Sequence, residues 1–196
     1  MFQYWVALDK ALFLAINGFH FEWLDPVMIF WSEKLVWFPL YALILFQIMK
    51  HFGWKQGLLC LIFITLGITF SDQMASGVLK PMVQRLRPCH NPDFEFLLHA
   101  PAGCGGSYGF ASSHSSNSMC IGLFYILLFK PKTLVFSLYI FWILLMGWSR
   151  MYLAAHYPGD ILAGWFIGGF GAYIFYKAFL WTKNKYSFAQ TDRFQT

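Results

Sequence analysis

Long apolar runs alternate with short polar segments along the chain. A helix needs about 20 predominantly apolar residues to cross the hydrocarbon core of a bilayer. Five runs come close to that length or exceed it, so they predict five membrane-spanning helices, the third being the shortest. We place these helices at Pro26–Met49, Gln56–Leu79, Ser113–Phe129, Thr133–Met151 and Pro158–Trp181.

Residues 1–24 are also apolar, but their pattern favours a helix lying in the membrane interface. A membrane-spanning helix here would place the charges of Asp9 and Lys10 at mid-depth, where a charge costs several kcal/mol. An amphipathic helix avoids that cost, and a sixth span is the alternative. The apolar positions that recur at helical spacing are Trp5, Leu8, Leu12 and Ile16.

The composition agrees with an integral membrane protein. Of the 196 residues, 58% are hydrophobic and 12% are charged, and the mean hydropathy is +0.52. Soluble domains carry about 25% charged residues, so this balance argues against a soluble protein. We therefore expect an all-α membrane bundle in which residues 1–196 form one domain. The N-terminus lacks the basic region and cleavage site of a secretory signal, so we expect it to be retained.

Basic residues predict how the bundle is oriented. With five spans, one end carries most of the lysines, and the positive-inside rule assigns that end and the C-terminus to the cytoplasm of a bacterial inner membrane. Residues 80–112 then form a loop at the opposite, periplasmic face. The basic residues of the cytoplasmic end are Lys50, His51, Lys55, Lys130, Lys132, Lys177, Lys183, Lys185 and Arg193.

Three permanent cations lie near the ends of apolar runs on the outer side: Lys80, Arg87 and Arg150. An anion bound among them would relieve their mutual repulsion. Phosphate is the natural candidate, because Lys and Arg match its charge and Arg also matches its geometry. Taken alone, Lys80 and Arg87 are equally compatible with binding lipid headgroups at the interface.

The third predicted span opens with Ser112, Ser113 and His114, after a glycine-rich stretch. Small hydroxyl residues at this position predict an N-cap, and the first free N–H groups of a helix can bind an anion. Capping alone would explain the serines. An imidazole at the start of a membrane helix is costly without a partner, so His114 favours a functional site.

His156 and Asp160 lie at the start of the fifth predicted span. Pro158 suits the first helical position, which places Asp160 in the first turn, four residues after His156. The carboxylate could hold one ring nitrogen of the imidazole and leave the other free as a nucleophile. A structural capping pair is the alternative.

These segments resemble the three motifs of the type-2 phosphatidic acid phosphatase superfamily. Lys80–Pro88 reproduces the pattern K-x6-R-P, and Ser149–Asp160 reproduces S-R-x5-H-x3-D. The middle motif, P-S-G-H, here reads Ala111-Ser112-Ser113-His114, so Ala replaces Pro and Ser replaces Gly. The loss of Gly bears on how closely the N–H of Ser113 approaches a phosphate.

The resemblance implies a membrane lipid phosphatase that needs no metal or other cofactor. It implies that His156, oriented by Asp160, attacks phosphorus and forms a phosphohistidine. His114 would protonate the leaving group as the general acid. The residues that would bind the phosphoryl oxygens are Lys80, Arg87, Ser112, Ser113 and Arg150.

Cys89 and Cys104 both fall in the predicted outer loop. If that face is periplasmic, the two thiols could form a disulfide, because disulfides persist in oxidising compartments. A zinc site that adds His90 and His99 is the alternative, but it matches no familiar ligand spacing.

A site at the ends of the spans suits a lipid phosphate whose tails remain in the bilayer. The candidate substrates are undecaprenyl pyrophosphate, a phosphate of lipid A, phosphatidylglycerol phosphate and phosphatidic acid. The alternative function is a transporter or binding protein for an anion or lipid phosphate, which the absence of a sequence repeat disfavours. We expect the membrane and a lipid phosphate as partners and no nucleic acid, and the sequence makes no prediction of oligomeric state.

Overall fold

The computed structural model describes residues 2–94 and 97–191, which are predominantly helical and contain no β-strand. The prediction of an all-α protein is therefore confirmed. The α-helices of this part of the chain are α1 (Phe2–Gly18), α2 (Asp25–Ser32), α3 (Phe38–Asp72), α4 (Lys80–Val83), α5 (Ser113–Phe129), α6 (Thr133–Tyr152) and α7 (Pro158–Thr191). The shorter helical segments are the 3-10 turns η1 (Lys34–Trp37), η3 (Pro88–His90) and η4 (Pro92–Phe94) and the π-helix η2 (Gln73–Leu79).

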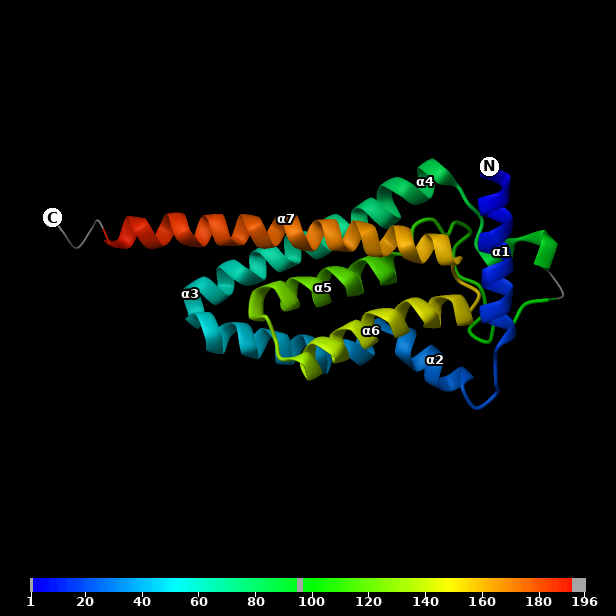
Figure 1. Ribbon diagram of the computed structural model, residues 1–196, viewed down its shortest axis with the longest axis horizontal. Coiled ribbons are helices and arrows are strands. Elements are labelled where there is room, and N and C mark those ends of the chain that lie inside the picture. Colours follow the sequence, from blue (N-terminus) through cyan, green and yellow to red (C-terminus); the bar gives the residue numbers. More distant parts are fainter. Residues whose placement is uncertain (1, 95–96, 192–196) are drawn as a thin grey trace.

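Helix α3 folds back on itself at Gly53, so that it consists of two antiparallel arms (Figure 1). Gly53 has φ 69° and ψ 177°, a conformation that residues with a Cβ atom rarely adopt. The turn falls between the predicted spans Pro26–Met49 and Gln56–Leu79, as the sequence led us to expect.

The first predicted span, Pro26–Met49, is not one continuous helix, and the prediction was wrong on this point. Helix α2 ends at Ser32, Glu33 has an extended backbone with φ −76° and ψ 128°, and η1 then leads into α3. The side chains of Glu33 and Lys34 are both exposed. The break thus lets two adjacent charged residues avoid the packed interior of the bundle.

Three helical stretches of the described residues are long and apolar enough to cross a membrane: Lys34–Val83, Thr133–Tyr152 and Pro158–Tyr186. The first includes the turn at Gly53 and therefore both arms of α3. Helix α5 has 17 residues, near the lower limit for a span. A membrane protein is thus supported, while the number of spans, five or six, remains a prediction.

Helix α5 lies between α3, α6 and α7 and packs against all three (Figure 1). Its central position carries the start of the helix, and with it His114, into the middle of one end of the bundle. The side chains that form the main apolar core are Ile44, Ile48, Cys60, Ile64, Cys120, Ile121, Phe124, Tyr125, Tyr139, Trp142, Ile143, Ala172 and Phe179.

Helices α5 and α7 come very close because α7 carries glycines one helical turn apart. A Cβ atom at Gly164 would lie 2.5 Å from the carbonyl oxygen of Ser112, and one at Gly168 would lie 2.0 Å from that of Ser116. Small residues four positions apart allow this kind of backbone contact between membrane helices. The contact brings the start of α5 beside the start of α7.

We expect Gly168→Ala to lower the free energy of unfolding by about 1–3 kcal/mol, because the added methyl group must push two helix backbones apart. The matched control is Gly169→Ala, whose Cβ would meet its nearest neighbour at an ordinary 3.7 Å. Thermal unfolding of the two variants in detergent measures the difference. Equal melting temperatures would contradict the close contact between α5 and α7.

The three predicted motifs converge on one end of the bundle, where α4, the end of α6 and the starts of α5 and α7 gather (Figure 1). The turn at Gly53 and the end of α7 lie at the opposite end. Lys50 precedes that turn and Lys130 follows α5, so the lysines predicted to be cytoplasmic lie away from the motifs. Arg193 lies outside the described residues.

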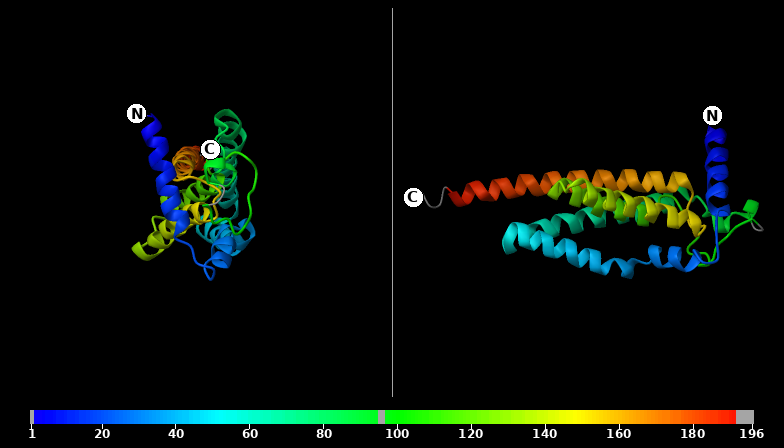
Figure 2. Two further views of the ribbon diagram at one scale, coloured as in Figure 1. Left: turned by 90° about the vertical axis from the view of Figure 1, so that its right-hand side faces the viewer. Right: turned by 60° about the horizontal axis from the view of Figure 1, so that its bottom comes forward.

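Helix α1 lies across the motif-bearing end at a steep angle to the long helices (Figure 1, Figure 2). Phe13 and Asn17 are fully buried, and the Asn17 amide donates a hydrogen bond to the carbonyl oxygen of Tyr152 at 2.8 Å. The apolar stripe predicted from the sequence faces away from the packed core, with Trp5 60% and Leu12 48% exposed. This arrangement suits a helix that is docked on the bundle and presents apolar side chains to lipid.

Candidate active site

Lys80, Arg87 and Arg150, which we call the cation cluster, are partly buried and lie within electrostatic range of one another. Among the described residues, no carboxylate oxygen lies within ion-pair distance of any of the three. The Nη1 atom of Arg150 donates to the hydroxyl of Ser32 at 2.7 Å, but its buried Nε has no hydrogen-bond partner within residues 2–94 and 97–191. A buried, unsatisfied donor within a group of like charges indicates an anion-binding site.

Local structure explains how each cation is placed. The π-helix η2 immediately precedes Lys80, and such segments often occur at functional sites. The backbone N–H of Arg87 donates to the carbonyl oxygen of Ser107 at 3.0 Å, and the side-chain Nε of Arg87 donates to the carbonyl oxygen of Tyr108 at 3.2 Å. Arg150 lies in the last turn of α6. The loop segment around Ser107 therefore holds Arg87 near the two helix ends.

The Cys89 and Cys104 side chains form a disulfide, with their Cα atoms 5.8 Å apart. Together with His90 they form the one group of described residues whose ligand atoms are close enough to hold a metal ion, within 4.8 Å of one another. A disulfide offers no thiolate, so a zinc site would require its reduction. His99, the fourth residue of the zinc alternative, instead lies 2.6 Å from a carboxylate oxygen of Asp25.

Ser112 acts as the N-cap of α5 in the structure. Its hydroxyl oxygen accepts a hydrogen bond from the N–H of Ser115 at 3.4 Å, and its own N–H donates to the carbonyl oxygen of Asp160 at 3.0 Å. Ser113 is 8% exposed, and His114 lies within electrostatic range of Arg150 and of the other predicted catalytic imidazole. The capping alternative thus accounts for the Ser112 hydroxyl, and phosphate binding by this residue remains a prediction.

His156 and Asp160 are almost completely buried, at 1% and 0% exposure. Nδ1 of His156 lies 3.6 Å from Oδ2 of Asp160, which is longer than a hydrogen bond, and no other described residue forms a hydrogen bond with it. The backbone N–H of His156 donates to the carbonyl oxygen of Arg150 at 3.2 Å, which fixes the imidazole beside the cation cluster. This separation is compatible with a catalytic pair, because contacts of this kind shorten in the complex with substrate.

Burial lowers the pKa of His156 to about 4, with Asp160 partly opposing the shift and Arg150 and Arg87 adding to it. The loss of water around the imidazole disfavours its charged form, and the nearby cations repel the proton. The imidazole is therefore neutral at ordinary pH. A neutral imidazole retains the lone pair that a nucleophile requires.

The free energy of unfolding should depend on pH through His156. Its folded-state pKa of about 4 lies below the ordinary 6.5, so the stabilisation present above 6.5 is lost as the pH falls through about 4. The full difference is roughly 3 kcal/mol. Thermal unfolding over this range should show a larger loss for the wild type than for His156→Asn. Parallel curves for the two proteins would mean that the imidazole takes up a proton as readily in the folded protein as in the unfolded one.

A sequence profile of the PAP2 superfamily matches residues 57–184, which contain all three motifs. The chain belongs to the PAP2 superfamily. The resemblance on which the sequence prediction rested is thereby confirmed, and the PAP2 profile spans the whole cation cluster and both histidines.

Relatives of this PAP2 protein are phosphatases. The chain is 39% identical over 178 residues to the lipid A 4'-phosphatase of Bacteroides thetaiotaomicron, covering 90% of the chain and 79% of the relative. It is 29% identical to the lipid A 4'-phosphatase of Porphyromonas gingivalis, with coverage of 94% and 78%. It is also 29% identical to the undecaprenyl-diphosphatase of Sulfolobus acidocaldarius, with coverage of 86% and 77%. The prediction of a phosphatase is therefore confirmed.

Solved structures share the fold. The crystal structure of the PAP2-type phosphatidylglycerolphosphate phosphatase of Bacillus subtilis matches with a TM-score of 0.64 at 26% identity, covering 86% of this chain and 83% of that one. Aquifex aeolicus LpxE matches with a TM-score of 0.62 at 21% identity, covering 87% and 95%. The long apolar helices and the transmembrane neighbour from Bacillus subtilis indicate a membrane protein with this fold.

Two charged residues at the PAP2 site were not predicted from the sequence to act there: Arg85 and Asp9. Arg85 contacts Asp160, and Asp9 contacts Arg85. Arg85 lies between the Lys and Arg of the first motif, and Asp9 is a charge within an apolar helix. The charge within α1 is the signal that could have marked Asp9, because charged residues in apolar membrane segments are often functional.

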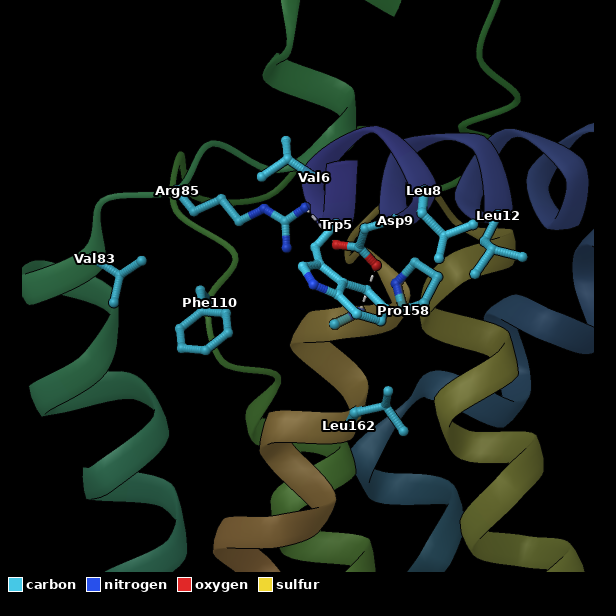
Figure 3. A pocket seen from close by; sticks show the side chains of 11 residues that line it. Trp5, Val6, Leu8, Asp9, Leu12, Val83, Arg85, Phe110, Pro158 and Leu162 are labelled. Atoms are coloured by element: carbon cyan, nitrogen blue, oxygen red, sulfur yellow. Dashed lines mark hydrogen bonds and ion pairs between the residues drawn. The ribbon is translucent and has the colours of Figure 1, made fainter. Parts of the chain in front are cut away.

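An apolar cavity of about 590 Å³ lies beside these two residues, between α1, α4 and α7 (Figure 3). Asp9 and Arg85 are its only charged lining residues within the described part of the chain. The rest of the lining consists of Trp5, Val6, Leu8, Leu12, Val83, Phe110, Pro158, Gly159 and Leu162.

Proposed function

We propose that this PAP2 protein hydrolyses a phosphate group from a membrane lipid at the periplasmic face of the inner membrane. The observation that carries the proposal is the cation cluster, which has no ion pair with a carboxylate among the described residues, beside two imidazoles at one end of an apolar bundle. The cations suit a phosphoryl group, and the imidazoles suit its transfer to water. The apolar cavity beside α1 adds support, because it would accommodate hydrocarbon better than a soluble phosphate ester.

The proposed reaction has two steps. In the first, a lone pair of the His156 imidazole forms a bond to phosphorus while the bond to the leaving oxygen breaks, and His114 donates a proton to that oxygen. In the second, a water molecule attacks the phosphohistidine, the phosphorus–nitrogen bond breaks, and His114 takes up the proton of the water. The cation cluster would bind the phosphoryl oxygens throughout, so kinetics should be ping-pong in character.

We propose a lipid A phosphate as the preferred substrate, ahead of undecaprenyl pyrophosphate. Support comes from the two relatives named as lipid A 4'-phosphatases, which align over most of this chain. The proposed orientation, with the C-terminus in the cytoplasm, follows from the lysines at the end opposite the cation cluster. The Cys89–Cys104 disulfide supports it, because disulfides persist in the periplasm.

Phosphate release by the purified protein in detergent, with EDTA present, tests the proposal. The panel contains lipid A, undecaprenyl pyrophosphate, phosphatidylglycerol phosphate and phosphatidic acid. We expect release without added metal, fastest from lipid A, with mass spectrometry locating the phosphate that is lost. If no lipid released phosphate, the result would instead favour an anion transporter or binding protein. Phosphate release that stops in EDTA would refute the metal-independent mechanism.

A further inference from the structure

Arg85 joins two carboxylates that belong to different helices. Its Nη1 atom donates to Oδ1 of Asp160 at 2.9 Å, and its Nη2 atom donates to Oδ2 of Asp9 at 2.6 Å. The centre of the guanidinium group also lies 3.9 Å from the centre of the Tyr157 ring. Both terminal nitrogens of Arg85 are therefore engaged, which separates it from the cation cluster, where carboxylate partners are lacking among the described residues.

The two oxygens of the buried Asp160 carboxylate have different partners. Oδ1 accepts the hydrogen bond from Arg85, whereas Oδ2 accepts one from the N–H of Tyr157 at 3.0 Å and faces Nδ1 of His156. Rotation of the carboxylate would break both hydrogen bonds. Arg85 thus helps to fix the oxygen that faces the imidazole.

Asp9 holds Arg85 in place from α1. One oxygen of Asp9 accepts the hydrogen bond from Arg85, and the other accepts a hydrogen bond from the N–H of Gly159 at 2.7 Å (Figure 3). Gly159 lies in the first turn of α7, next to Asp160. A single side chain from the N-terminal helix therefore fixes both Arg85 and the turn that carries Asp160.

Helix α1 has other anchors that would hold it without Asp9. Phe13 is fully buried and packs against Phe94 and Tyr157, and Asn17 donates to backbone carbonyl oxygens. Lys10 forms an ion pair with Asp93 at 2.7 Å. Because these contacts already attach α1 to the bundle, docking alone does not account for a charge placed against Arg85.

We propose that Asp9 and Arg85 are positioning residues that hold the Asp160 carboxylate against the catalytic imidazole of His156. The inference rests on the proposed phosphatase mechanism and adds to it a part played by the N-terminal helix. Asp9 orients Arg85, Arg85 orients Asp160, and Asp160 orients His156. Neither Asp9 nor Arg85 touches the reacting phosphate.

The charge of Arg85 also affects His156 through Asp160. The charged or titratable groups that face His156 are Asp160 from α7, Arg150 from α6, Arg87 from the loop and His114 from α5. Without Arg85, the negative charge of Asp160 would be less compensated and would draw a proton to His156 more strongly. The pKa of His156 should therefore rise in Arg85→Gln.

The predicted effect is on turnover rather than on substrate binding. We expect Arg85→Gln and Asp9→Asn to lower kcat by about 10–100-fold, as for other residues that orient a catalytic group, and to change KM by less than about threefold. Asp9→Glu, which keeps the carboxylate, should recover most of the activity. The acid limb of the pH profile should move upward in Arg85→Gln and not in Asp9→Asn, where Arg85 still compensates Asp160.

Two variants of α1 serve as controls. Lys10→Ala removes a neighbouring charge outside the proposed chain of contacts and should keep the wild-type kcat. Asn17→Ala loosens the docking of α1 and reports what a purely structural defect does. Wild-type kcat in Asp9→Asn would overturn the proposal. The proposal would also be overturned if Asp9→Asn and Asn17→Ala, at equal melting temperature, lost the same fraction of kcat and both moved the acid limb of the pH profile upward.

A readout independent of turnover separates failure of this inference from failure of the proposed function. Imidazole carbons labelled with carbon-13 report the protonation of His156 by NMR, with its signal assigned by its loss in His156→Asn. An upward shift of the His156 titration in Arg85→Gln supports the chain of contacts even if no lipid phosphate is hydrolysed. An unchanged titration would refute it even in an active phosphatase.

Discussion

Replacing His156 with Ala is expected to reduce phosphate release by a factor on the order of 10⁴ or more, the scale found when a nucleophile is removed from other hydrolases. The reason is that the His156 imidazole is buried beside the cation cluster, and its neutral form keeps the lone pair that attack on phosphorus requires. Phosphate release by wild type and variant under identical conditions measures the effect. Substrate binding should be retained, because the cation cluster is intact.

The same experiment can identify the intermediate. With substrate labelled at phosphorus, the wild type should carry label that is lost in acid and kept in base, as expected of a phosphorus–nitrogen bond. His156→Ala should carry none, and His90→Ala, which alters an exposed histidine outside the cluster, should label like the wild type. Wild-type turnover in His156→Ala would rule out the proposed nucleophile.

Arg150→Ala is expected to raise KM by at least about 10²-fold, because it removes two charge-assisted hydrogen bonds to a phosphate, each worth about 1.5–3 kcal/mol. This cation is chosen because its Nε has no hydrogen-bond partner in the described part of the chain. Competition by inorganic phosphate or vanadate should weaken in parallel with KM. Arg150→Lys, which keeps the charge but loses the planar geometry, should fall between the wild type and Arg150→Ala.

Stability provides the control for this variant. Because Arg150 repels the other members of the cation cluster, its removal should leave the melting temperature of the unliganded protein unchanged or raise it slightly. Bound vanadate should raise the melting temperature of the wild type but not that of Arg150→Ala. An unchanged KM in a well-folded Arg150→Ala protein would contradict the proposed phosphate site.

The sequence allowed the main features of the site to be predicted because they depend on local spacing. Lys80, Arg150 and His156 each lie at the end of an apolar run. Because successive spans cross the membrane in opposite directions, these ends must lie on the same side of it. The turn at Gly53 was equally predictable, because a polar segment separates two long apolar runs in the sequence. Such features follow from the order of residues along the chain and from the thickness of a bilayer.

Other features depend on contacts between distant parts of the chain. Asp9 meets Arg85, 76 residues away, and Gly159, 150 residues away. The pattern of α1 predicts an apolar stripe that faces lipid, but it does not indicate that the face bearing Asp9 and Phe13 is docked on the bundle. The break at Glu33 was missed because length and hydropathy describe an apolar run without revealing whether its helix is continuous.

The docking of α1 bears on how the enzyme is made. Ribosomes release the N-terminus first, at about 5–20 residues per second, so α1 emerges long before its partners at Gly159 and Arg85. Until α7 has been inserted, Asp9 has no partner on that helix. We therefore expect α1 to wait at the membrane surface and to dock only when synthesis is almost complete. Catalytic competence would then appear at the end of biogenesis, and partly synthesised chains would be unable to act on lipid.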